Sequence, residues 1–234
     1  MIGPLISLIT ILLINLELSL AQRIDEVASI KADSSQESKA PILIIQPKYM
    51  RSEVVMMIPK ARHTVYSAGY LGKLGLTNFK AEEFRMKYRG GWKEFKKKAL
   101  KQSAILLKSI QPEYIKNTQG DIKYAILQSS DPLLASSVHT GEFRKIFKSP
   151  FGPNLWVIIP NRSTILVMKA DKNRLNTYKK AFYHMFLDAT YPVSREVFLV
   201  NPDGFSAIGD LNPVSYTHLR APRDRQKSRM PSSA

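Results

Sequence analysis

The chain has 234 residues, no cysteine and a formal net charge of +16 at pH 7. The absence of cysteine excludes disulfide bonds, thiolate metal sites and cysteine catalysis, so packing must stabilise the fold. The positive charge favours an anionic polymer, a lipid surface or a protein as partner, although a lysine-rich surface also serves solubility alone.

The N-terminal segment, residues 1–21, has the pattern of an export signal. Its residues 5–16 are mostly apolar, and Ser19-Leu20-Ala21 places small residues three and one before a cleavage point. Glu17 interrupts the apolar run before it reaches the ~20 residues that span a bilayer. We therefore predict a signal peptide cleaved after Ala21, and a secreted or periplasmic protein with no integral membrane domain after cleavage. An uncleaved anchor helix is the alternative.

The C-terminal residues 214–234 have no apolar periodicity. They resemble translated sequencing-adapter sequence, so we predict that residues 212–234 are disordered and foreign to the natural protein. The alternative is a basic tail that binds nucleic acid through its phosphates, but no specific nucleic-acid motif accompanies it.

The part between these ends divides into a polar linker, an N-terminal extension and a main domain, at residues 22–40, 41–91 and 92–211. Within the extension, short β-branched runs predict strands at Ile42–Ile45 and Glu53–Ile58. A helical pattern begins at Asn78 and ends at Gly90-Gly91. The segment His63–Gly75 has no clear pattern.

The main domain alternates helical and strand patterns. In chain order, the expected elements are a helix at Trp92–Ile110, a strand at Ile122–Leu127, a helix capped by Asp131, a hairpin of Leu155–Ile159 and Thr164–Met168, a helix capped by Asp171 at Lys172–Ala189, and a hairpin of Glu196–Val200 and Phe205–Ile208. The first hairpin is continuously apolar, which indicates burial on both faces. The order predicts an α+β fold, with a largely antiparallel sheet built from two hairpins and helices packed on one face.

The densest positive patch of the main domain lies on its first helix. The apolar residues of this helix share one broad face, and the candidate anion-binding lysines lie elsewhere on it, at Lys93, Lys96, Lys97 and Lys101. The alternative is a solvated helix face whose lysine stems pack down on the surface.

Arg162 is the other candidate anion-binding residue. It lies in the turn Pro160-Asn161-Arg162-Ser163, between two predicted buried strands. Such rigid support suits a side chain that binds carboxylate or phosphate through a fork of donors. The alternative is a structural ion pair with a neighbouring loop acid.

His139 and Glu142 are the candidate metal ligands. A His-x-x-Glu pair is half of a zinc carboxypeptidase site, in which a further histidine and a water complete the coordination. His184 could supply that histidine, and Glu142 is then also the candidate catalytic residue. The alternative is an exposed histidine at a helix end. The chain has no G-x-S-x-G, P-loop or G-x-G-x-x-G motif, so we expect no cofactor.

Four segments, KKKALKQS, DPLLASSV, LWVIIPNRSTILVM and YPVSREVFLV, occupy residues 96–103, 131–138, 155–168 and 191–200. Together they resemble the YtpQ-like family of uncharacterised bacterial domains, over about residues 92–211. The resemblance implies an α+β fold and no established activity. In the family an acidic residue often follows the turn arginine, whereas Ser163 stands there in this chain. Most members look cytosolic, so the export signal is a second departure.

These patterns together predict a secreted basic domain of unknown function that is not an enzyme. We expect it to bind an anionic macromolecule or a protein partner. The alternative hypothesis is a zinc-dependent hydrolase of the carboxypeptidase type that uses His139 and Glu142.

Overall fold

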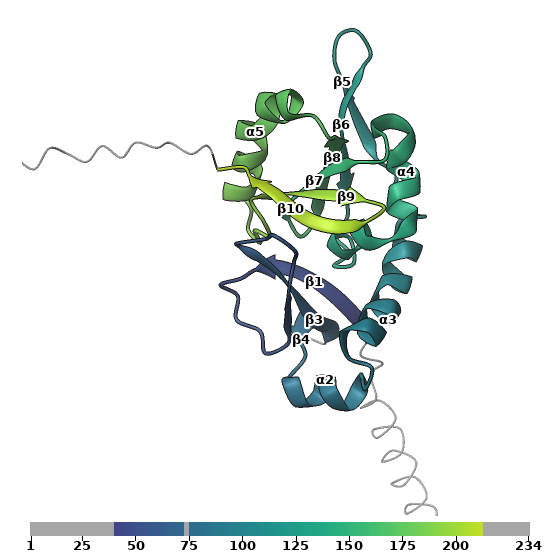
Figure 1. The fold of residues 1–234 in the computed structure, drawn as a ribbon, viewed down its shortest axis with the longest axis vertical. Coiled ribbons are helices and arrows are strands. Elements are labelled where there is room, and N and C mark those ends of the chain that lie inside the picture. Colours follow the sequence, from purple (N-terminus) through teal and green to yellow (C-terminus); the bar gives the residue numbers. More distant parts are fainter. Residues whose placement is uncertain (1–39, 73–74, 213–234) are drawn as a thin grey trace, which may run out of the picture.

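The computed structural model describes residues 40–72 and 75–212, so the predicted signal peptide and nearly all of the predicted linker and tail lie outside the described residues (Figure 1). The described residues form two antiparallel sheets, four α-helices and one short 3-10 helix. The predicted α+β class and antiparallel sheet are confirmed. Within these residues, no helix combines the length and the apolar character that crossing a membrane requires.

The N-terminal sheet is organised around its strand β3, which pairs with each of the other three strands. β1 runs along one edge of β3, and β2 and β4 share the other edge. The strands are β1 (Pro41–Pro47), β2 (Val55–Met57), β3 (Thr64–Gly72) and β4 (Gly75–Asn78). Both predicted strands are present, the second in shortened form. The segment without a clear pattern forms the central strand.

Gly69 allows three strands of this sheet to approach each other closely. A Cβ atom at this position would collide with the side chain of Ile44 on β1 and would lie 2.7 Å from the carbonyl oxygen of Thr77 on β4. Glycine inside a strand often marks such a close approach. The central strand therefore requires a residue that weakens any strand pattern in the sequence.

Replacing Gly69 by alanine is expected to lower the free energy of unfolding by about 1–3 kcal/mol, because the added methyl group overpacks against backbone. Urea denaturation measures this loss. Gly141→Ala is the matched control, since a Cβ atom at Gly141 meets nothing within 4 Å. An equal loss in both variants would contradict the crowding at Gly69.

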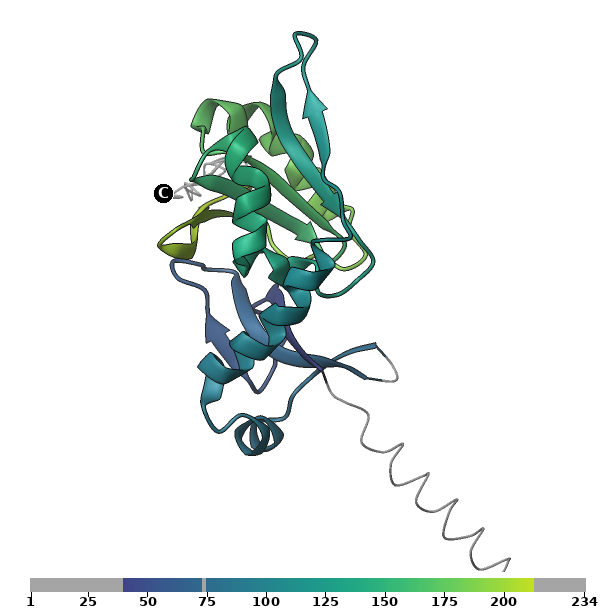
Figure 2. The same cartoon turned by 90° about the vertical axis from the view of Figure 1, so that its right-hand side faces the viewer.

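An aromatic cluster holds the two helices that follow the N-terminal sheet, α2 (Ala81–Lys87) and α3 (Gly91–Leu106). The rings of Phe84 and Phe95 both pack against Phe79, which follows β4, with centroids 6.4 and 6.2 Å away. From this cluster α3 continues to the C-terminal half of the molecule, where it contacts the 3-10 helix η1 (Ala135–His139) and α4 (Gly141–Phe151) (Figure 2). The helix predicted after the double glycine is thus confirmed.

The C-terminal sheet has six strands in the order β10-β9-β7-β8-β6-β5. Both predicted hairpins lie in it, and they pair with each other through β7 and β9. A third hairpin supplies β6, which was predicted, and β5, which was not. The strands are β5 (Glu113–Lys116), β6 (Ile122–Gln128), β7 (Leu155–Asn161), β8 (Thr164–Lys169), β9 (Glu196–Asn201) and β10 (Gly204–Asp210).

A bulge in β7 explains how a proline fits into a central strand. The pairing of β7 with β8 shifts by one residue after Ile158, which leaves an extra residue in β7. Pro160 lies in this bulge, where its missing N–H breaks no ladder bond. Its carbonyl accepts a hydrogen bond from the N–H of Val193 (3.0 Å), which ties the segment before β9 to this end of the sheet.

Side-chain caps set the starts of the two later helices. Asp171 accepts hydrogen bonds from two backbone N–H groups in the first turn of α5 (Lys172–Leu187), at 2.9 and 3.2 Å, as predicted. Thr140 accepts one from the N–H of Phe143 (3.2 Å) and so starts α4. The helix expected after Asp131 is a short 3-10 helix instead, η1 (Ala135–His139).

The helices cover both faces of the C-terminal sheet instead of the one face that we expected (Figure 1). On one face α4 (Gly141–Phe151) packs in the same cluster as Val157 of β7. On the other face Phe182 of α5 (Lys172–Leu187) packs in a second cluster with Ile158 of β7. Because successive strand residues point to opposite faces, the continuously apolar hairpin requires cover on both.

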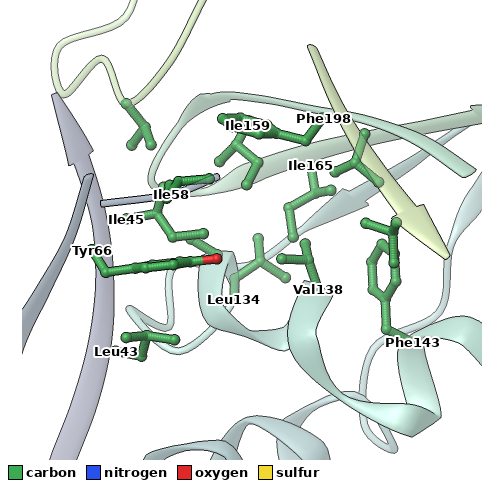
Figure 3. Packing of buried hydrophobic residues seen from close by; sticks show 14 of the residues in the cluster. Leu43, Ile45, Ile58, Tyr66, Leu134, Val138, Phe143, Ile159, Ile165 and Phe198 are labelled. Carbon is green, nitrogen blue, oxygen red and sulfur yellow. The ribbon is translucent and has the colours of Figure 1, made fainter. Parts of the chain in front are cut away.

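One hydrophobic core joins the two sheets (Figure 3). Ile45 and Tyr66 of the N-terminal sheet belong to the same buried cluster as Val138 of η1, Phe143 of α4 and Phe198 of β9. The predicted N-terminal extension therefore shares its buried side chains with the predicted main domain.

Candidate functional site

Three of the predicted lysines form a row on the outer face of α3. Lys93, Lys97 and Lys101 are exposed, whereas Phe95 and Ala99 are buried on the opposite face. The spacing of four residues aligns the three side chains over about 12 Å of helix. Within the described residues, no carboxylate lies within 4.0 Å of their ammonium groups. We call these three residues the lysine row.

Lys96 lies apart from the lysine row. Its Nζ is 4.6 Å from the centre of the Tyr66 ring, and the residue is half-buried. Burial lowers the pKa of Lys96, because desolvation disfavours the charged ammonium. Its contact with the ring is a cation–π interaction, so this lysine belongs to the join between α3 and the N-terminal sheet.

Arg162 lies in the turn between β7 and β8, as predicted, but β7 continues to Asn161, so the turn has two residues instead of four. The turn is fixed by Asn161, whose Oδ1 accepts hydrogen bonds from both the N–H and the hydroxyl of Ser163 (3.0 Å each). The guanidinium carbon lies 5.3 Å from the centre of the Tyr191 ring. Among the described residues no carboxylate pairs with Arg162 within 4.0 Å. Arg162 lines a cavity of about 590 Å³, to which α3 contributes no residue.

The structure gives His139 and Glu142 different surroundings. The ring of His139 lies between Tyr66 and Phe205, with centroids 5.1 and 4.5 Å away, and its Nε2 is enclosed without a hydrogen-bond partner among the described residues. Burial, reinforced by the charge of Lys96, lowers the pKa of His139 to about 3. His139 is therefore a neutral part of an aromatic cluster.

Glu142 lies on the surface of α4 and pairs with Lys145 (3.2 Å). It lines a different cavity from His139. Within residues 40–72 and 75–212, no three histidine, aspartate or glutamate side chains are grouped so that they could hold a metal ion. The structure thus adds no further ligand to the predicted His-x-x-Glu pair.

Sequence reasoning missed a set of polar contacts between the two sheets, which we call the polar seam. The N–H of Arg62 donates to Oε1 of Glu196 (2.7 Å), and the hydroxyls of Thr64 and Ser194 are hydrogen-bonded to each other (2.7 Å). Glu196 is buried, and its Oε2 has no hydrogen-bond partner among the described residues. These contacts fix how the start of β3 meets the start of β9.

The exposed end of the polar seam is a cluster of three charged or polar side chains. Arg195 donates from Nε to Oδ2 of Asp210 (3.0 Å) and from Nη2 to Nε2 of His63 (2.9 Å). A guanidinium only donates, so Nε2 of His63 is the acceptor in this contact. No local motif could have indicated the cluster, because His63 and Arg195 are 132 residues apart in the sequence.

Comparison of the chain with protein-family models, with curated proteins and with solved structures finds no match. The resemblance to the YtpQ-like family therefore stays a prediction, and the candidate sites rest on the geometry alone.

Proposed function

We propose that the protein is a secreted, non-enzymatic binding module that docks on an anionic polymer through the lysine row of α3. The observation that carries this proposal is the alignment of Lys93, Lys97 and Lys101, all exposed and without a carboxylate in reach among the described residues. Successive ammonium groups start from positions about 6 Å apart along the helix. This spacing suits a linear partner that carries repeated negative charges.

The buried side of α3 holds the lysine row in a fixed position. Phe95 and Ala99 fix the helix against the core, so the row is displayed by a rigid element. The formal net charge of +16 adds a long-range attraction for the same class of partner. Single exposed charges contribute little affinity, whereas three in a line can neutralise several charges of one polymer and release their counterions.

Removing the lysine row is expected to weaken binding to dextran sulfate by roughly 10-fold or more at 50 mM NaCl, and to flatten the decline of affinity with salt. The variant is Lys93→Gln/Lys97→Gln/Lys101→Gln, and titration calorimetry at 50, 100 and 200 mM NaCl measures both effects. The matched control, Lys116→Gln/Lys172→Gln/Lys180→Gln, removes the same charge from three exposed lysines elsewhere.

Equal losses in the two triple variants would show that net charge alone drives binding, and would overturn the role of the row. Vesicles that contain an anionic phospholipid separate a second partner class. Binding to these vesicles, with none to dextran sulfate, would replace the polymer by a lipid surface.

A further inference from the structure

The cavity beside Arg162 has the dimensions and lining of a small-molecule site. Its volume is about 590 Å³, within the roughly 300–1,000 Å³ that is usual for ligand pockets. Leu71 and Leu76 of the β3–β4 hairpin line one side, and Pro132 and Ala189 also contribute apolar surface. The cavity thus lies where the N-terminal sheet meets one end of the C-terminal sheet.

Arg162 is the one charged side chain among the described residues that line this cavity. Its position is fixed on two sides. Asn161 holds the turn through Ser163, and the strand bulge bonds the carbonyl of Pro160 to the N–H of Val193. The second bond anchors the segment that carries Tyr191, whose ring packs against the guanidinium. The donors of Arg162 are therefore held in place while no described carboxylate uses them.

Two large apolar side chains at this cavity are exposed to solvent. Leu71 is 56% exposed and Tyr191 is 63% exposed, and both line the cavity. Isolated exposed apolar residues need no explanation, but these two belong to one concave site. A ligand with an apolar body would cover them.

We propose that this cavity binds a small monocarboxylate with an apolar body. The carboxylate accepts hydrogen bonds from the guanidinium of Arg162, which suits a planar oxyanion. The apolar body lies against Leu71, Leu76 and the ring of Tyr191. A single guanidinium balances a single negative charge, so this lining favours a carboxylate over a dianionic phosphate.

The test compares 3-phenylpropionate with its neutral amide, 3-phenylpropionamide, by titration calorimetry on the purified protein. We expect the carboxylate to bind roughly 10-fold or more tightly than the amide, because a charge-assisted bidentate contact is lost in the amide. Acetate lacks the apolar body and inorganic phosphate lacks the matching charge, so both are expected to bind more weakly. Equal affinity for carboxylate and amide, or a preference for phosphate, would overturn the proposal.

Two variants test the two halves of the site. Arg162→Gln is expected to abolish the preference for the carboxylate over the amide. Leu71→Glu is expected to weaken both ligands, and the carboxylate by at least roughly 10-fold, because it removes apolar surface and adds a repelling charge. Both positions are partly or largely exposed, and circular dichroism checks that the variants fold. Unchanged preference in Arg162→Gln would contradict the assignment.

The control is Arg85→Gln, which removes an exposed arginine of α2 and is expected to change neither ligand's affinity. This inference does not depend on the lysine row. The triple glutamine variant of the row is expected to bind 3-phenylpropionate like the wild type, so failure of one proposal leaves the other standing.

Discussion

Lowering the pH from 7 to 4.5 is expected to remove about 2–3 kcal/mol from the free energy of unfolding through His139 alone. In the folded protein the pKa of His139 is lowered to about 3, whereas its ordinary value is 6.5. Between these values the unfolded chain binds a proton that the folded protein does not. The free energy of unfolding is therefore unaffected by protonation of His139 above pH 6.5. As the pH falls from 6.5 towards 3, protonation of His139 in the unfolded chain lowers this free energy by about 1.4 kcal/mol for each pH unit.

The surroundings of His139 explain why a proton is excluded. Tyr66 and Phe205 enclose the ring, and Nε2 has no acceptor among the described residues. The ammonium of Lys96 lies over the Tyr66 ring, and Arg144 lines the same small cavity as His139. A positively charged imidazolium would thus be desolvated and repelled by the charge of Lys96.

His139→Phe isolates this contribution, because phenylalanine keeps a ring in the aromatic cluster and cannot be protonated. Urea denaturation at pH 7 and pH 4.5 should show a smaller difference for this variant than for the wild type, by about 2–3 kcal/mol. His184→Gln is the control: His184 is exposed on α5, and the wild-type difference is expected to persist. Parallel pH profiles for the wild type and His139→Phe would refute the prediction.

Truncating Phe95 is expected to destabilise both sheets together, by about 3–5 kcal/mol. Its fully buried ring contacts Phe79, Tyr88 and Trp92 in the N-terminal half. The core that contains Phe95 continues into the C-terminal sheet. If this core unfolds as one unit, a change at Phe95 must lower the unfolding midpoint of strands that it does not touch.

The two tryptophans of the chain allow a direct measurement. Trp92 lies beside Phe95, whereas Trp156 is on β7 and packs against the second cluster. In a Trp92→Phe background, the fluorescence of Trp156 reports on the C-terminal sheet alone. We expect Phe95→Ala to lower the urea midpoint read by Trp156. Met86→Ala, on the exposed face of α2, is expected to leave the free energy of unfolding within about 0.5 kcal/mol of the parent value. An unchanged midpoint in Phe95→Ala would mean that the two halves unfold separately.

The C-terminal sheet could be predicted largely from local patterns. Apolar runs separated by turn residues identified both hairpins. The observed ends of their strands lie within two residues of the predicted ends. The central strand β3 was not predicted, because buried Ser67, Ala68 and Gly69 stand where a strand usually has β-branched residues. Their small size follows from strands packed on both sides, which is a tertiary constraint that no short window contains.

Within the candidate site, the arrangement of the lysines could be predicted, because the geometry of one helix determines it. A spacing of four residues places Lys93, Lys97 and Lys101 in one row and rotates Lys96 by about 100° from Lys97 towards the buried side. The environment of His139 could not be inferred, because its ring partners, Tyr66 and Phe205, come from strands of two different sheets. The contacts of Glu196 and Arg195 could not be inferred either, because their partners Arg62 and His63 are more than a hundred residues away in the sequence.

The polar seam also constrains when the chain can finish folding. Its bonds from Arg62 to Glu196 and from Thr64 to Ser194 close loops of more than a hundred residues. Such closures have a large entropic cost that local contacts cannot offset in advance. The N-terminal sheet emerges first during synthesis, yet Tyr66 meets Phe205 only after nearly all the described chain exists. We expect the nascent N-terminal half to stay incompletely packed until then, with part of its apolar surface open to solvent or to other proteins.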